Sequence, residues 1–88
     1  MTEKMSDFKD ILRSHNLRPT QQRVNLGKLL FGKLDRHITA EILKQESDYE
    51  NLKVSKATVY NVLNDFYGAG LLAKVNIDDG IAELVKIF

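Results

Sequence analysis

The most regular hydrophobic pattern in the chain lies between residues 55 and 68, where apolar residues recur at helical spacing. Four residues at i, i+3, i+4 and i+7 share one stripe: Val59, Val62, Leu63 and Phe66. The opposite face carries small polar and aromatic residues: Ala57, Tyr60, Asn61 and Asn64, with Thr58 and Asp65 along one edge. Ser55 is a suitable N-cap, and Gly68 and Gly70 stand where a helix should end. The pattern predicts a helix over about residues 55–68.

Two helices are predicted at the beginning of the chain. The first covers about residues 6–15, with Ser6 as its N-cap and an inward stripe of Phe8, Ile11 and Leu12. The second covers about residues 20–32 and is apolar on most sides, which predicts a central place in the core. Pro19 favours an extended residue before it, and Thr20 is a good N-cap, so the second helix is predicted to begin there.

A third helix is predicted over about residues 39–48, with Thr39 as its N-cap. Ile38 before this cap and Leu43 inside the helix match a hydrophobic staple, which fixes the angle at which the chain enters the helix. Ile42, Leu43 and Tyr49 are expected to face the core.

The pattern changes after Gly70 to two apolar-rich runs, residues 71–77 and 81–88, separated by Asp78-Asp79-Gly80. Asp-Gly between two such runs indicates a β-hairpin, here over about residues 71–87. Four helices followed by a two-stranded wing make a mainly α winged helix-turn-helix. In that fold the third and fourth helices form the helix-turn-helix, and the fourth is the recognition helix.

Composition narrows the class of protein. At 88 residues the chain is expected to be one domain, and its lack of cysteine excludes disulfides, thiolate metal sites and a cysteine nucleophile. The sequence has no long apolar run and no secretion-signal pattern, so a cytoplasmic protein without membrane contact is expected. It also shows no Ser-His-Asp set, paired catalytic carboxylates or phosphate-binding glycine loop, so the chain is predicted not to be an enzyme.

Charge leaves two interpretations open. The net charge is only +1, whereas strong DNA binders are usually distinctly basic. Residues 11–36 nevertheless carry six basic residues against one acid, and acids gather in residues 41–50. This distribution fits either a polyanion-binding side or ordinary surface charge. The outer face of the fourth helix suits contacts with base edges and phosphates, but a core helix with an accidental outer face would look similar.

Four segments, in matching order and spacing, resemble the DNA-binding domain of the ferric uptake regulator (Fur) superfamily over about residues 8–75. They are residues 17–24 (LRPTQQRV), 37–41 (HITAE), 57–63 (ATVYNVL) and 70–71 (GL). The first and third are most similar to the iron response regulator (Irr) branch. The resemblance implies a sequence-specific transcription regulator, a repressor in an iron response. Its partner would be double-stranded DNA, an AT-rich palindrome, with the fourth helix in the major groove.

The resemblance also implies which residues contact DNA. Tyr60 matches the recognition-helix tyrosine that packs against thymine methyls, and Asn61 stands where many members have an arginine. Arg18 matches the basic residue that approaches the minor groove or its flanking phosphates. The full predicted set adds positions near the phosphate backbone and neighbouring polar or basic residues: Arg18, Arg23, Ser55, Lys56, Thr58, Tyr60, Asn61, Asn64 and Lys74.

The chain also departs from the family pattern. Family members continue into a domain that dimerises and uses iron, zinc or haem. This chain stops at Phe88, so that C-terminal domain is expected to be absent and the chain to be a monomer or weak dimer. Residues 80–88 match the family's second strand poorly. His37 aligns with a metal-binding histidine of many members, but one imidazole cannot hold a metal usefully, so no metal or other cofactor is expected. His15 is expected to act locally, near the last carbonyls of the first helix.

Two alternatives to DNA binding remain. The chain could be a winged-helix protein–protein interaction module, such as a truncated regulator that engages a full-length relative. The near-neutral charge and Asp65 on the fourth helix favour that alternative. A structural module without a direct DNA role is the third interpretation.

Overall fold

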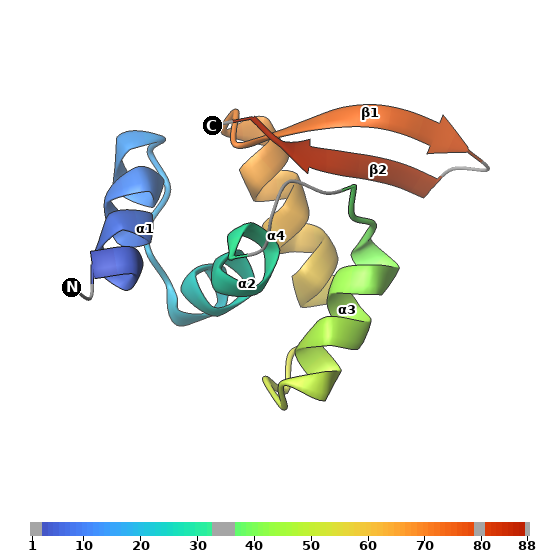
Figure 1. Cartoon of the computed structure of the whole chain (residues 1–88), viewed down its shortest axis with the longest axis horizontal. Helices are drawn as coiled ribbons and strands as arrows, with labels where there is room; N and C mark the ends of the chain where they lie inside the picture. The colour runs from blue at the N-terminus through green and yellow to red at the C-terminus, as the bar shows by residue number, and fades with distance from the viewer. Residues whose placement is uncertain (1–2, 33–36, 79–80, 88) are drawn as a thin grey trace.

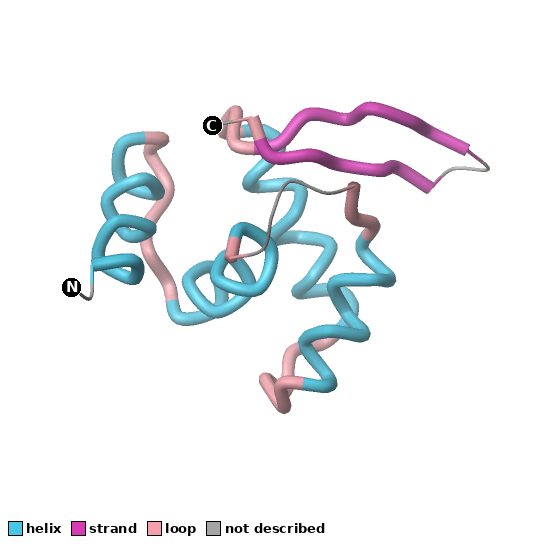
Figure 2. The backbone as a smooth tube through the Cα atoms, viewed as in Figure 1, coloured by secondary structure: helices cyan, strands magenta, loops and turns pink. Residues whose placement is uncertain are grey.

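A computed structural model of the protein describes residues 3–32, 37–78 and 81–87. Four helices are followed by a two-stranded antiparallel hairpin (Figure 1). The elements are α1 (Glu3–Ser14), α2 (Gln21–Phe31), α3 (Ala40–Tyr49), α4 (Lys56–Gly68), β1 (Leu72–Asp78) and β2 (Ile81–Lys86). This order confirms the predicted winged helix-turn-helix. The hairpin extends from the end of α4 across the end of the molecule where α3 begins (Figures 1 and 2).

The core lies where α2 and α4 meet the other elements. Three phenylalanine rings join α1, α2 and α4: Phe8 lies 5.4 Å from Phe31 and 6.1 Å from Phe66 between ring centroids, and Phe31 lies 5.6 Å from Phe66. The predicted stripe of α4 is buried, as are the predicted staple residues Ile38 and Leu43. Helical periodicity therefore predicted the buried face of α4 correctly.

Hydroxyl side chains begin three of the helices, as the sequence predicts. Thr20, Thr39 and Ser55 are extended, and each side-chain oxygen accepts a hydrogen bond from the backbone N–H three residues later. The first helix differs from the prediction, because it begins at Glu3 and Ser6 lies within it. Glu, Lys and Met are good helix formers and extend the helix towards the N-terminus. The predicted N-cap at Ser6 is therefore wrong.

Three helices end at a residue with a left-handed backbone. Asn16 after α1, Asn51 after α3 and Gly70 after α4 have φ angles of 65°, 59° and 88°. At the end of α4 the N–H of Gly70 donates to the carbonyl of Tyr67 (3.1 Å), and the N–H of Leu71 donates to that of Phe66 (2.9 Å). This pair of bonds is a Schellman motif, which satisfies the last carbonyls and turns the chain sharply into β1.

A third segment of the chain pairs with the hairpin and helps to anchor it to the helices. In the hairpin itself, Leu72 pairs with Lys86, and the register shifts between Lys74 and Asn76, which leaves Val75 in a bulge. Ile38, just before α3, pairs with Leu84 of β2 through two backbone hydrogen bonds of 3.0 and 2.9 Å. Both side chains are buried. The predicted turn residues 79 and 80 lie outside the described residues.

Two residues of α3 were predicted to face the core and do not. Ile42 is 41% exposed and Tyr49 is 88% exposed, whereas Leu43 and Ser47 of the same helix are fully buried. Leu43 and Ser47 are four residues apart and therefore define the inner face, which turns Ile42 towards solvent. Tyr49 is the last residue of the helix. The Ser47 hydroxyl is satisfied by donating to the carbonyl of Lys44 at 2.8 Å.

Candidate nucleic-acid interface

The outer face of α4 presents the aromatic and amide side chains that the sequence predicts to read DNA. Tyr60 is 45% exposed, and Asn61 and Asn64 are exposed as well. Neither amide has a hydrogen-bond partner within the described part of the chain. The buried stripe on the opposite side holds the helix in this rotation. The side-chain amides of Asn61 and Asn64 are therefore available to donate and accept hydrogen bonds with a bound partner.

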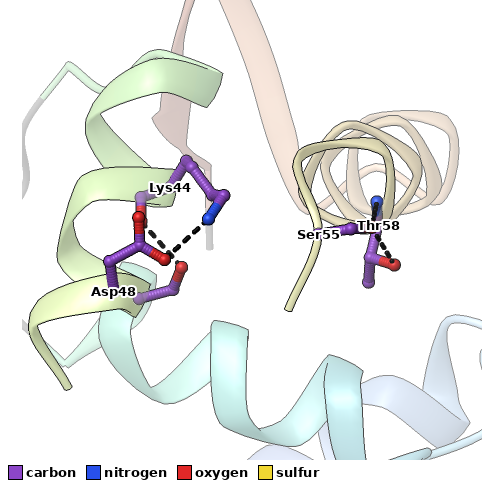
Figure 3. Close-up of polar contacts among 5 residues, drawn as sticks. Lys44, Asp48, Ser55 and Thr58 are labelled. Carbon is purple, nitrogen blue, oxygen red and sulfur yellow. Dashed lines mark hydrogen bonds and ion pairs between the residues drawn. The ribbon is translucent and has the colours of Figure 1, made fainter. Parts of the chain in front are cut away.

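The beginning of α4 gathers three more of the predicted residues. Ser55 Oγ accepts from the Thr58 N–H at 3.1 Å and donates to Thr58 Oγ1 at 3.0 Å, as Figure 3 shows. Lys56 follows as the first residue of the helix and is exposed. The partial positive charge of a helix N-terminus and an adjacent lysine both favour an anion.

An ion pair within α3 engages its central lysine. Lys44 Nζ lies 2.6 Å from Asp48 Oδ1, one helical turn away, and Figure 3 shows this pair on α3 beside the start of α4. Such surface pairs contribute about 0.3–0.5 kcal/mol. Lys44 therefore has a partner on its own helix.

Two of the predicted basic residues are engaged inside the chain. Arg23 on α2 lies 3.0 Å from the carboxylate of Asp65 on α4 and also donates to the carbonyl of Arg18 at 2.9 Å. Lys74 on β1 places its ammonium 4.5 Å from the ring centroid of Tyr67, a cation–π contact. Arg18 itself is exposed just before α2.

The structure thus gathers six of the nine predicted residues at α4 or its cap, and places Arg18, Arg23 and Lys74 on neighbouring segments. Their roles as DNA contacts stay predictions. Sequence reasoning missed the Arg23–Asp65 and Lys74–Tyr67 contacts. The first joins opposite charges that are 42 residues apart, a separation that no local pattern reveals.

Both histidines have a partner within the chain. His15 Nδ1 lies 2.9 Å from the carbonyl oxygen of Ile11, which confirms the predicted interaction with the end of the first helix. His37 Nδ1 lies 3.0 Å from Glu83 Oε1 of β2. Two such side chains fall short of the three or four ligands of a usual metal site, and no larger cluster of metal-binding side chains occurs among the described residues. These residues alone do not fit a regulatory metal.

No helix in the described ranges is long and apolar enough to cross a membrane.

Comparison with known proteins assigns a family. Residues 14–84 match the model of the ferric uptake regulator family. The ferric uptake regulation protein of Pseudomonas fluorescens is 38% identical over 71 residues, which cover 81% of this chain and 58% of that protein. The Shigella flexneri protein is 32% identical over 76 residues, which cover 86% of this chain and 51% of that protein.

Solved structures agree with this result. The ferric uptake regulator from Pseudomonas aeruginosa with manganese superimposes with a TM-score of 0.81 and 32% identity over 98% of this chain and 60% of that one. The Vibrio cholerae ferric uptake regulator superimposes with a TM-score of 0.85 and is 27% identical, over 93% of this chain and 63% of that one. This chain therefore spans less than two thirds of the length of each of these four relatives. The chain belongs to the ferric uptake regulator family.

Proposed function

We propose that this chain is a sequence-specific DNA-binding domain of a Fur-family transcription regulator, with α4 in the major groove. The observation that carries the proposal is the outer face of α4, where an exposed tyrosine and two amides without partners in the described part of the chain lie opposite a buried stripe. The relationship to ferric uptake regulators supports it, since the similar Vibrio cholerae regulator has DNA-binding domains. The proposal makes the chain a binding module, not an enzyme.

Each side chain of the interface has a contact suited to its chemistry. The ring of Tyr60 would pack against thymine methyls, and the amides of Asn61 and Asn64 would pair with adenine N6 and N7. Lys56 and the capped start of α4 would bind phosphates, and Arg18 would reach the minor groove or its flanking phosphates. These contacts favour AT-rich sites. We further propose that the chain acts in repression during an iron response, with two such domains bound to one palindrome. Membership in the Irr branch stays a prediction, since the relatives above are ferric uptake regulators.

The test is fluorescence anisotropy at low salt with an AT-rich palindromic duplex and a scrambled duplex of the same length. Tyr60→Ala and Asn61→Ala should each weaken the palindrome by about 1–3 kcal/mol and change the scrambled duplex little. Arg18→Ala should weaken both duplexes alike, because a phosphate contact carries no sequence information.

Tyr49→Ala is the matched control, because Tyr49 is an exposed tyrosine at the end of α3 and is absent from the proposed face. It should leave both affinities unchanged. Absence of binding to any duplex at low salt would refute the proposed function. Unfolding by Tyr60→Ala would show that the ring supports the core and that its assignment to the groove is wrong.

A further inference from the structure

Arg23 connects the two segments that the proposed function places on DNA. Its Nη1 donates to the carbonyl of Arg18 at 2.9 Å, and its Nη2 donates to Asp65 Oδ2 on α4 at 3.0 Å. The carbonyl of Arg18 also accepts from the N–H of Thr20 at 2.8 Å. One guanidinium therefore fixes the backbone of the Arg18 segment relative to the recognition helix. We propose that Arg23 is a positioning residue that aims Arg18 and α4 together, and not a DNA contact; this rests on the proposed DNA-binding function.

The geometry requires arginine in particular. The planar guanidinium presents its donors in a rigid fork, so one arm reaches a carbonyl while the other reaches a carboxylate. A lysine has a single ammonium at the end of a flexible stem and would satisfy the two acceptors with less geometric precision. The Arg23 side chain is 21% exposed and that of Asp65 42%, so the pair is partly shielded from solvent. Both bonds are charge-assisted, and partial shielding from solvent reduces the screening of the ion pair.

The pair also accounts for an acid on the recognition helix. A free carboxylate at Asp65 would repel phosphates and would favour a protein partner over DNA. The ion pair of Asp65 with Arg23 has no net charge, so it presents no net repulsion to the duplex. Two of the five donors of the Arg23 guanidinium are used by Asp65 and by the carbonyl of Arg18, and the side chain is only 21% exposed, which leaves it poorly placed to bind a phosphate as well.

The direction in which Asp65→Asn changes the affinity for DNA shows whether Asp65 acts through its charge or through the pair with Arg23. If Asp65 acted on DNA only through its charge, Asp65→Asn would remove repulsion and tighten binding. If the pair positions the interface, Asp65→Asn weakens binding by loosening the Arg18 segment. We expect Asp65→Asn and Arg23→Gln each to weaken binding to the AT-rich palindrome by about 5- to 10-fold, and the double variant to be no weaker than Arg23→Gln, because coupled residues are not additive.

The dependence of affinity on salt gives a second criterion. Loss of one phosphate contact reduces the slope of log affinity against log salt by about 0.9. Arg23→Gln should lower the affinity and leave this slope at the wild-type value, whereas Arg18→Ala should reduce it. The control is Asp10→Asn, because Asp10 forms an exposed ion pair with Arg13 (3.4 Å) within α1, and neither residue belongs to the proposed interface. It should change neither affinity nor slope.

A measurement without DNA keeps this inference separate from the proposed function. In backbone NMR spectra of the free protein, Asp65→Asn should shift the amide signals of Arg18 and Thr20. The Arg23 guanidinium joins Asp65 to the carbonyl of Arg18, and that carbonyl accepts from the N–H of Thr20. If the wild type binds no duplex, the proposed function fails, and the NMR result still decides whether the link exists. Tighter binding by Asp65→Asn, a slope reduced by about one for Arg23→Gln, or unmoved amide signals would overturn the inference.

Discussion

Gly27→Ala should destabilise this protein, although alanine is the better helix former. Gly27 lies inside α2 and is buried, and Phe8 of α1 packs directly against it. A Cβ built on Gly27 would lie 2.2 Å from Cε2 and 2.3 Å from Cζ of Phe8. Carbon atoms do not approach so closely, so the Phe8 ring would have to move. The missing side chain at Gly27 is therefore what allows α1 to pack on α2.

The magnitude follows from opposing effects. Alanine in a helix interior is favoured over glycine by about 0.8–1.0 kcal/mol. Displacing the Phe8 ring costs about 1–3 kcal/mol for overpacking and about 0.5–1.5 kcal/mol for each lost aromatic contact. The ring has two such neighbours, Phe31 and Phe66. We expect the free energy of unfolding to fall by about 1–5 kcal/mol, depending on how many of the two contacts are lost, and Tm to fall by about 4–8 °C for each kcal/mol.

Urea and thermal unfolding followed by circular dichroism would measure this change. The control is Gly68→Ala, because a Cβ at Gly68, the last residue of α4, meets no atom within 4 Å. That substitution should be neutral or slightly stabilising. In a Phe8→Leu background, Gly27→Ala should no longer destabilise, since the ring that it meets is gone. A Gly27→Ala protein as stable as the wild type would refute the packing argument.

Three further predictions concern the end of α4, the phosphate contacts and metal. Gly70→Ala should lower the free energy of unfolding by about 1–2 kcal/mol, because a φ of 88° is unfavourable for any residue with a side chain, although the space around Gly70 is open. Urea unfolding measures this change, and an unchanged stability would contradict the argument from backbone strain. The log–log salt slope of DNA affinity should be roughly −3 to −4, and a flat response would contradict phosphate contacts. Titration with divalent metal or haem should change DNA affinity less than about tenfold, because His37 and Glu83 supply only two ligands; a larger change abolished by His37→Ala would refute this.

The local features of the fold were predictable from the sequence. Ser55 and Thr39 indicate helix starts through a short-range hydrogen bond, and the burial of α4 follows from a spacing within one helix. The same reasoning failed for Ile42, because Ile42 and Leu43 are both apolar and only packing against α2 and α4 decides which of them is buried. Tertiary packing overrides the local pattern there.

The candidate interface was predictable in composition but not in arrangement. Tyr60 and Asn61 are identified by their place on a helix face, which is a local property. Arg23, by contrast, looks in the sequence like any other basic residue. Its partner Asp65 lies on another helix, and only the folded chain brings the two together. Periodicity can say which residues face outwards, but it does not say which of these pair with one another.

The pairing of Ile38 with Leu84 has a consequence for how the protein unfolds. Its two backbone hydrogen bonds join the entry to α3 with β2, segments far apart in the sequence. A hairpin alone is marginally stable and would fray independently. Because of these two bonds, the hairpin cannot detach from the helices without breaking its pairing with the segment before α3. The amide hydrogens of Ile38 and Leu84 should therefore show one common free energy of opening in hydrogen exchange, set by a single cooperative opening that includes the wing and the helix-turn-helix.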